Sequence, residues 1–95
     1  MSAYVIVDVD IKDPVKYAAY KELTPASIAA FGGKFLARGG PVDVLEGSWQ
    51  PGRIVILVFP SREQASAWWA SDNYAPAKAI RQEAAETQLI IVDGV

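Results

Sequence analysis

Four short segments of this chain are apolar at both odd and even positions, and this feature most narrows the folds available to it. The segments cover residues 3–11, 34–38, 53–59 and 88–92, and their β-branched and aromatic residues favour strands. A sheet with one solvated face alternates apolar and polar residues. These segments therefore predict a sheet that is apolar on both faces.

A helix is expected after the first strand. Asp13 can accept from the free N–H groups of a first turn, and Pro14 suits the first helical position. Pro25 is expected to kink or restart this helix. Gly32 and Gly33 are expected to end it through a left-handed backbone conformation.

Two further helix starts follow the third strand. Ser61 predicts an N-cap, with Gln64 in the capping-box position. Ser71 and Asp72 offer a second cap, for a helix over roughly residues 73–85.

Glycine and proline dominate the segment between the second and third strands. Gly39, Gly40 and Pro41 are expected to bend the chain. Residues 42–46 are predicted to continue the second strand, and residues 47–52 carry turn chemistry.

The resulting order is β-α-β-β-α-β. Right-handed crossovers on both β-α-β units then give an α+β, ferredoxin-like fold with a four-stranded antiparallel sheet in the order 4-1-3-2. All helices lie on one face of that sheet. Residues 1–95 are expected to form one domain.

The uncovered sheet face predicts a homodimer. A bare apolar patch of several hundred Å² forgoes several kcal/mol at roughly 25 cal/mol per Å², while a domain of this size is stable by only about 5–15 kcal/mol. Pairing with a second copy, sheet against sheet, is the simplest way to cover the patch, which makes a dimeric α/β barrel.

The composition removes several classes of function. The chain has no cysteine and no histidine, which excludes disulfides, thiol nucleophiles, Cys or His metal sites and Ser-His-Asp triads. A net charge of −2 disfavours a nucleic-acid partner. No membrane-length apolar run, signal peptide, phosphate loop or dinucleotide turn is recognisable. We expect a cytoplasmic protein without metal or cofactor.

Several motifs along the chain resemble one known family. They are Phe31–Gly40, Val44–Trp49, Arg53, Phe59–Ser61, Ala67–Trp69, Ser71, Tyr74 and Arg81. Together they resemble the domain of unknown function 1330 family, which belongs to the dimeric α/β-barrel superfamily. The resemblance implies a ferredoxin-like dimer, and relatives in the superfamily include small monooxygenases, lactone isomerases and stress-related binding proteins. Trp69 stands where the family would have tyrosine, so this position offers no hydroxyl.

The charged candidates lie on or beside the strands. Arg38, next to two glycines, is either an anion clamp or the ion-pair partner of Asp8 or Glu46. Asp8 shares the face of Tyr4 and Ile6, so it is either a general base with a raised pKa or the partner of Arg38. Glu46 is a candidate ligand contact or a partner of Arg53.

Aromatic residues on the helices suggest a pocket wall. Tyr17 and Tyr20 are three residues apart and share a side of their helix. Trp68 and Trp69 point about 100° apart, so one belongs to the core and the other to a groove. The candidate ligand-binding residues between helices and sheet are Arg38, Tyr20, Trp68, Tyr74, Glu46 and Arg81.

Three functions fit these features. The first is a homodimer that binds a small, partly apolar, anionic molecule. The second is a cofactor-independent isomerase or monooxygenase that uses Asp8 and Arg38. The third is a structural or interaction protein whose interior is filled by side chains. The volume of the cavity distinguishes the third from the other two.

Overall fold

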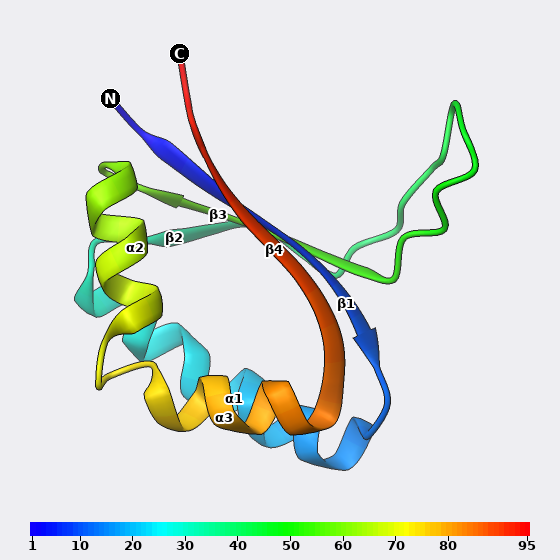
Figure 1. Cartoon of the computed structure of the whole chain (residues 1–95), viewed down its shortest axis with the longest axis horizontal. Helices are drawn as coiled ribbons and strands as arrows, with labels where there is room; N and C mark the ends of the chain where they lie inside the picture. The colour runs from blue at the N-terminus through cyan, green and yellow to red at the C-terminus, as the bar shows by residue number, and fades with distance from the viewer.

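One antiparallel sheet carries three helices on one face. The computed structural model describes residues 1–95, with β1 (Ala3–Ile11), α1 (Pro14–Ala30), β2 (Lys34–Arg38), β3 (Arg53–Phe59), α2 (Arg62–Ala70), α3 (Ala75–Ala84) and β4 (Ala85–Asp93). The strands are ordered β2-β3-β1-β4, and the helices lie to one side of them (Figure 1). The predicted ferredoxin-like α+β fold is confirmed, in the predicted strand order.

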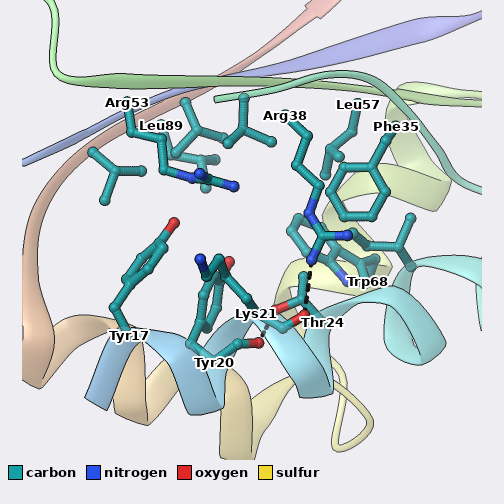
Figure 2. A pocket seen from close by; sticks show the side chains of 14 residues that line it. Tyr17, Tyr20, Lys21, Thr24, Phe35, Arg38, Arg53, Leu57, Trp68 and Leu89 are labelled. Atoms are coloured by element: carbon teal, nitrogen blue, oxygen red, sulfur yellow. Dashed lines mark hydrogen bonds between the residues drawn. The ribbon is translucent and has the colours of Figure 1, made fainter. Parts of the chain in front are cut away.

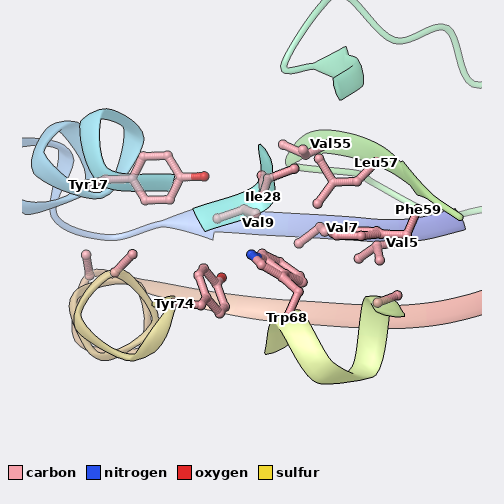
Figure 3. Close-up of a cluster of buried hydrophobic side chains, with 13 residues drawn as sticks. Val5, Val7, Val9, Tyr17, Ile28, Val55, Leu57, Phe59, Trp68 and Tyr74 are labelled. Atoms are coloured by element: carbon pink, nitrogen blue, oxygen red, sulfur yellow. The ribbon is translucent and has the colours of Figure 1, made fainter. Parts of the chain in front are cut away.

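The core lies between the helices and one face of the sheet. Register places Val5 of β1 between Leu57 of β3 and Ile91 of β4, so alternate side chains of the three strands share one face. The buried side chains that Figure 3 labels are Val5, Val7, Val9, Tyr17, Ile28, Val55, Leu57, Phe59, Trp68 and Tyr74. None of the helices has the length and apolar character needed to cross a membrane.

Both ends of α1 follow the sequence signals. The Asp13 carboxylate accepts from the N–H of Lys16 at 3.1 Å, with Pro14 in the first turn. Gly32 follows the helix with φ at +76°, a conformation that costs glycine little. Pro25 lies inside one continuous helix, so it does not restart the helix.

The caps of the other helices are confirmed in part. Ser61 accepts from the N–H of Gln64 at 3.1 Å, but the Gln64 side chain donates to the carbonyl of Phe31 instead of closing the capping box. The Ser71 hydroxyl accepts from the N–H of Tyr74 at 3.1 Å, directly before α3.

The segment between β2 and β3 departs from the prediction. Residues 42–46 form no strand, and residues 39–52 make an exposed arm that extends away from the sheet (Figure 1). The N–H of Gly39 makes the last backbone bond toward β3, to the carbonyl of Ile54 at 2.8 Å. Gly39 then turns the chain with φ at +75°, and Pro41 has no N–H with which to continue the ladder.

β4 begins three residues earlier than predicted. Ala85 pairs with Ile11 and Glu86 pairs with Asp10, so β4 follows α3 with no loop between them. Glu86, Thr87 and Gln88 interrupt the apolar pattern at the start of the strand. The strand period is therefore not visible in the sequence there, and pairing with the end of β1 decides the conformation.

The second face of the sheet is apolar and uncovered by helices. Ile90 is 58% exposed and Val92 is 44% exposed, although both belong to the sheet. The apolar side chains on this face, called the open face below, are Tyr4, Ile6, Ile54, Ile56, Val58, Ile90 and Val92. The predicted apolar character of both faces is therefore present in the structure.

We expect Gly33→Ala to destabilise the fold by about 1–3 kcal/mol, the usual effect of overpacking a core. A Cβ at position 33 would lie 2.6 Å from the Phe59 ring and 2.7 Å from Ile28. Gly40→Ala is the matched control, because nothing lies within 4 Å of its added Cβ. Urea unfolding measures both variants, and equal midpoints would contradict the expected tight contact.

Candidate functional site

A small pocket lies between α1 and the helix-side face of the sheet. Figure 2 shows strands above the pocket and α1 below it. Its volume is about 20 Å³, which is room for about one water molecule. Its walls are Val7, Val9, Tyr17, Tyr20, Lys21, Thr24, Ile28, Phe35, Arg38, Arg53, Val55, Leu57, Trp68 and Leu89. A ligand larger than water therefore enters only when side chains at the mouth move.

A β-bulge brings Arg38 to this pocket. Phe35 pairs with Leu57, and Arg38 pairs with Val55, so three residues of β2 advance against two of β3. The extra residue is Leu36, which is 58% exposed. One extra residue reverses the face of every later side chain. Arg38 therefore shares the helix-side face with Phe35.

Pro25 leaves free the backbone carbonyl that accepts a hydrogen bond from Arg38. In an α-helix the carbonyl of Lys21 would accept from the N–H of residue 25, but proline has none. The guanidinium of Arg38 donates instead to that carbonyl, at 2.8 Å. It also lies 4.4 Å from the centroid of the Phe35 ring. One donor of the guanidinium is thus satisfied by the protein, and the others remain at the mouth of the pocket.

Arg53 supplies a second guanidinium to the same pocket. It lies 5.7 Å from the centroid of the Tyr17 ring, and its Nε is buried without a hydrogen-bond partner. Gly39 makes this position possible, because a Cβ there would collide with the Arg53 guanidinium. The predicted Glu46–Arg53 pair is absent from the ion pairs of the structure.

A hydrogen-bonded chain lies behind the pocket. The Tyr20 and Tyr74 hydroxyls are 2.9 Å apart, and Arg81 Nε donates to the Tyr74 hydroxyl at 3.2 Å. Burial, and then the neighbouring Tyr74, raise the pKa of Tyr20 far above its usual value of 10.0. Burial, and then Tyr20, also raise the pKa of Tyr17. Both phenols therefore stay protonated and neutral at physiological pH.

Asp8 lies on the opposite side of the sheet from Arg38. Its carboxylate accepts from the indole N–H of Trp49 at 2.9 Å and from the N–H of Gly52 at 2.8 Å. Asp8 therefore anchors the base of the arm, and the hypothesis that pairs it with Arg38 is wrong. The bulge is the reason, because in a regular ladder Leu36 would pair with Ile56, and Arg38 would then lie on the open face with Asp8.

The remaining candidates are divided between the pocket, the core and the arm. Trp68 is buried and lines the pocket, whereas Trp69 is 41% exposed in a separate groove, as the 100° offset predicts. Tyr74 and Arg81 are buried behind the pocket, where Tyr74 contacts the lining residues Tyr20 and Trp68 and Arg81 bonds to Tyr74. Glu46 lies on the exposed arm and lines no cavity, so the structure does not bring it to Arg38 either.

The family assignment agrees with this geometry. The family model described as "Domain of unknown function (DUF1330)" matches residues 2–95. The chain belongs to this family. No curated protein matches the chain.

Solved structures share the fold at low sequence identity. A protein of unknown function from Rhodopseudomonas palustris matches with a TM-score of 0.80 and 20% identity, over 99% of this chain and 82% of that one. SnoaB, a cofactor-independent oxygenase from Streptomyces nogalater, matches with a TM-score of 0.68 and 11% identity, over 99% and 93%. A dimeric ferredoxin-like protein of unknown function from Jannaschia sp. CCS1 has a TM-score of 0.68 and 10% identity, over 99% and 100%.

The charge pattern of the sequence does not predict two features of the site, the orientation of Arg53 and the contact of Arg38 with the Lys21 carbonyl. The charge pattern pairs Arg53 with Glu46, yet Arg53 has the same parity along β3 as Val55 and Leu57, which face the core. The alternation along the strand therefore predicts that Arg53 faces the helices. Pro25 predicts that the carbonyl of Lys21, four residues earlier, lacks its usual helical donor. Nothing in the sequence identifies Arg38 as the donor that replaces it.

We expect Asp8→Asn to loosen the arm while the protein stays folded. The amide keeps one acceptor oxygen but loses the charge that holds both Trp49 and Gly52. Chymotrypsin should therefore cut the arm faster in this variant.

Asp10→Asn is the matched control, because Asp10 pairs only with the exposed Lys12. Equal cleavage rates for the two variants would refute the anchoring role of Asp8.

Proposed function

We propose that the protein is a homodimer that binds a small, partly apolar, anionic molecule in the pocket between α1 and the sheet. The observation that carries this proposal is the presence of two guanidinium groups, Arg38 and Arg53, on one apolar pocket without a carboxylate partner. The three ion pairs of the structure all involve other residues. A pocket anion would supply the missing counter-charge.

Burial makes the charge of Arg53 important. A buried cation or donor without a partner is unfavourable, and its Nε has neither water-facing surface nor an acceptor. An anionic group that reached both guanidiniums would accept charge-assisted bonds, which are stronger than neutral ones. The neutral phenols of Tyr17 and Tyr20 add no competing negative charge.

The apolar walls define the rest of the ligand. Apolar side chains, among them Phe35, Leu57, Ile28 and Trp68, line the rest of the pocket. A short aliphatic chain or one flat ring would match these walls. Because the closed cavity holds about 20 Å³, binding needs the long side chains at the mouth to swing outward.

The open face supports the dimer. Its branched side chains form a bare apolar surface in the single chain, and such surfaces mark interfaces. The related protein from Jannaschia is described as dimeric. Pairing through the open face would leave the helix-side pocket of each copy accessible, because the two faces are on opposite sides of the sheet.

A cofactor-independent oxygenase is the alternative function. Its support is the shared fold with the oxygenase from Streptomyces nogalater and the hydrogen-bonded Tyr20–Tyr74 pair at the pocket wall. Asp8 cannot serve as the base in such a reaction, because it holds the arm on the other face. The small cavity supports the third function, a structural protein with a filled interior.

A thermal-shift screen of small carboxylates against matched neutral compounds tests binding, since a ligand stabilises the state that binds it. We expect Arg38→Ala to weaken binding of a carboxylate found in the screen by about tenfold or more, as for loss of a charged hydrogen bond. Lys34→Ala is the control, because Lys34 is a cation of the same strand that does not line the pocket. If no carboxylate raises Tm, the filled-interior function is favoured.

We expect sedimentation to find a dimer at micromolar concentration, and Ile90→Lys to convert it to a monomer. Ile90 is 58% exposed on the open face, so the folded chain tolerates lysine there while a sheet-to-sheet interface does not. Val15→Lys on α1, where Val15 is 83% exposed, should leave the dimer intact. A wild-type monomer would refute the dimer.

A further inference from the structure

A second cavity, an open groove, lies at the edge of the sheet between α2, α3 and β4. Residues of α2, α3 and β4 line this groove, and Figure 1 shows where these three elements lie in the fold. Its volume is about 520 Å³, within the range of about 300–1,000 Å³ of small-molecule sites. The pocket described above is separate and shares only the Leu89 side chain with it.

Arg81 brings an uncompensated charge to this groove. The residue is only 5% exposed and forms none of the ion pairs of the structure. Its one hydrogen bond runs from Nε to the Tyr74 hydroxyl at 3.2 Å. A guanidinium has five N–H donors, so most of its donors have no acceptor from the protein. None of these remaining donors is among the buried side-chain atoms without a partner, so they keep contact with solvent and are free to bind a ligand.

The neighbouring groups suit an anion. The hydroxyl oxygen of Thr87 is buried without a hydrogen-bond partner and belongs to the same groove. The amide of Gln82 also lines the groove, and no carboxylate does. Thr87 can donate through its hydroxyl and Gln82 through its amide. The groove therefore offers one cation and several donors, with no competing negative charge.

The other wall of the groove is apolar. Trp69 is 41% exposed there, and Leu89 and Ile91 of β4 complete the wall. The Trp69 ring is held in place by Lys78, whose Nζ lies 3.9 Å from the ring centroid and donates to the Trp69 carbonyl at 3.0 Å. A ligand for this groove thus needs an anionic end and a hydrocarbon part.

We propose that this groove is a second binding site, for a small carboxylate that carries a hydrocarbon group. The carboxylate lies at Arg81 and Thr87, and the hydrocarbon lies on Trp69. The site is independent of the proposed function, because it uses none of the pocket arginines. Arg81 is hydrogen-bonded to Tyr74, which meets Tyr20 at 2.9 Å, so the two sites lie at opposite ends of one hydrogen-bonded chain.

The three tryptophans allow a direct test. Trp49 lies on the arm, Trp68 at the first pocket and Trp69 in the groove. In ¹⁵N-labelled protein each indole N–H gives its own signal, assigned with Trp→Phe variants. Titration with hexanoate should move the Trp69 signal to saturation. Hexanol has the hydrocarbon group without the charge, and inorganic phosphate has the charge without the hydrocarbon group. Each should therefore move the Trp69 signal far less.

Gln82→Glu is the informative variant. It places a negative charge beside the expected carboxylate on an exposed helix surface and should weaken hexanoate binding at Trp69 about fivefold, the effect of a unit charge about 4 Å away in water. Gln50→Glu makes the same change on the arm and should leave that affinity unchanged. Thr87→Val, which keeps the side-chain shape, should weaken binding while the fold is retained. Arg81 itself is kept, because it also holds Tyr74 in the core.

The proposal fails if Trp69 shows no saturable shift, or if Gln82→Glu and Gln50→Glu bind hexanoate equally. It also fails if hexanol or phosphate alone reproduces the hexanoate response. A Trp68 shift that Arg38→Ala abolishes, with the Trp69 response unchanged, supports two independent sites. A Trp69 shift that Arg38→Ala abolishes overturns the proposal, because hexanoate then acts through the first pocket.

Discussion

A continuous line of aromatic rings holds the two layers of this protein together. Successive ring centroids are 5.4 Å apart from Phe59 to Trp68, 4.2 Å from Trp68 to Tyr74, 6.3 Å from Tyr74 to Tyr20 and 5.1 Å from Tyr20 to Tyr17. The line starts in β3, passes through α2 and the start of α3, and ends on α1. Each such pair contributes about 0.5–1.5 kcal/mol beyond the burial of its area.

This line of rings also determines where the pocket lies. Large rings between α1 and the strands keep the helix at a distance from the sheet, and the space left beside them is lined by Phe35 and Trp68 (Figure 2). Arg38 then ties α1 to β2 across the mouth through the carbonyl of Lys21. The same side chain is therefore a structural tie and the strongest candidate for ligand contact, and its remaining donors allow both roles.

Most of the fold follows from local chemistry that the sequence displays. Asp13 and Ser61 mark helix starts because each side chain can accept from backbone N–H groups, and both do so. Ser71 accepts from the N–H of Tyr74 in the turn before α3, but α3 itself has no side-chain cap. The apolar content of both sheet faces is likewise visible as a pattern. The site is less predictable, because it depends on contacts between segments far apart in the chain. The parity of Arg38 is decided by register against β3, and the partner of Asp8 arrives from residue 49.

The bulge in β2 leaves Leu36 outside the regular pairing of the sheet. Leu36 is largely exposed and pairs with nothing across the ladder, so many different amino acids can stand there. If Leu36 entered the ladder instead, Arg38 would turn outward and exchange environments with Ala37, whereas removal of Leu36 would leave Phe35, Ala37 and Arg38 in the pairing that they already have. Relatives that replace residue 36 and relatives that lack it can therefore both keep the arginine on the helix side, so neither kind of change at this position would by itself remove Arg38 from the pocket.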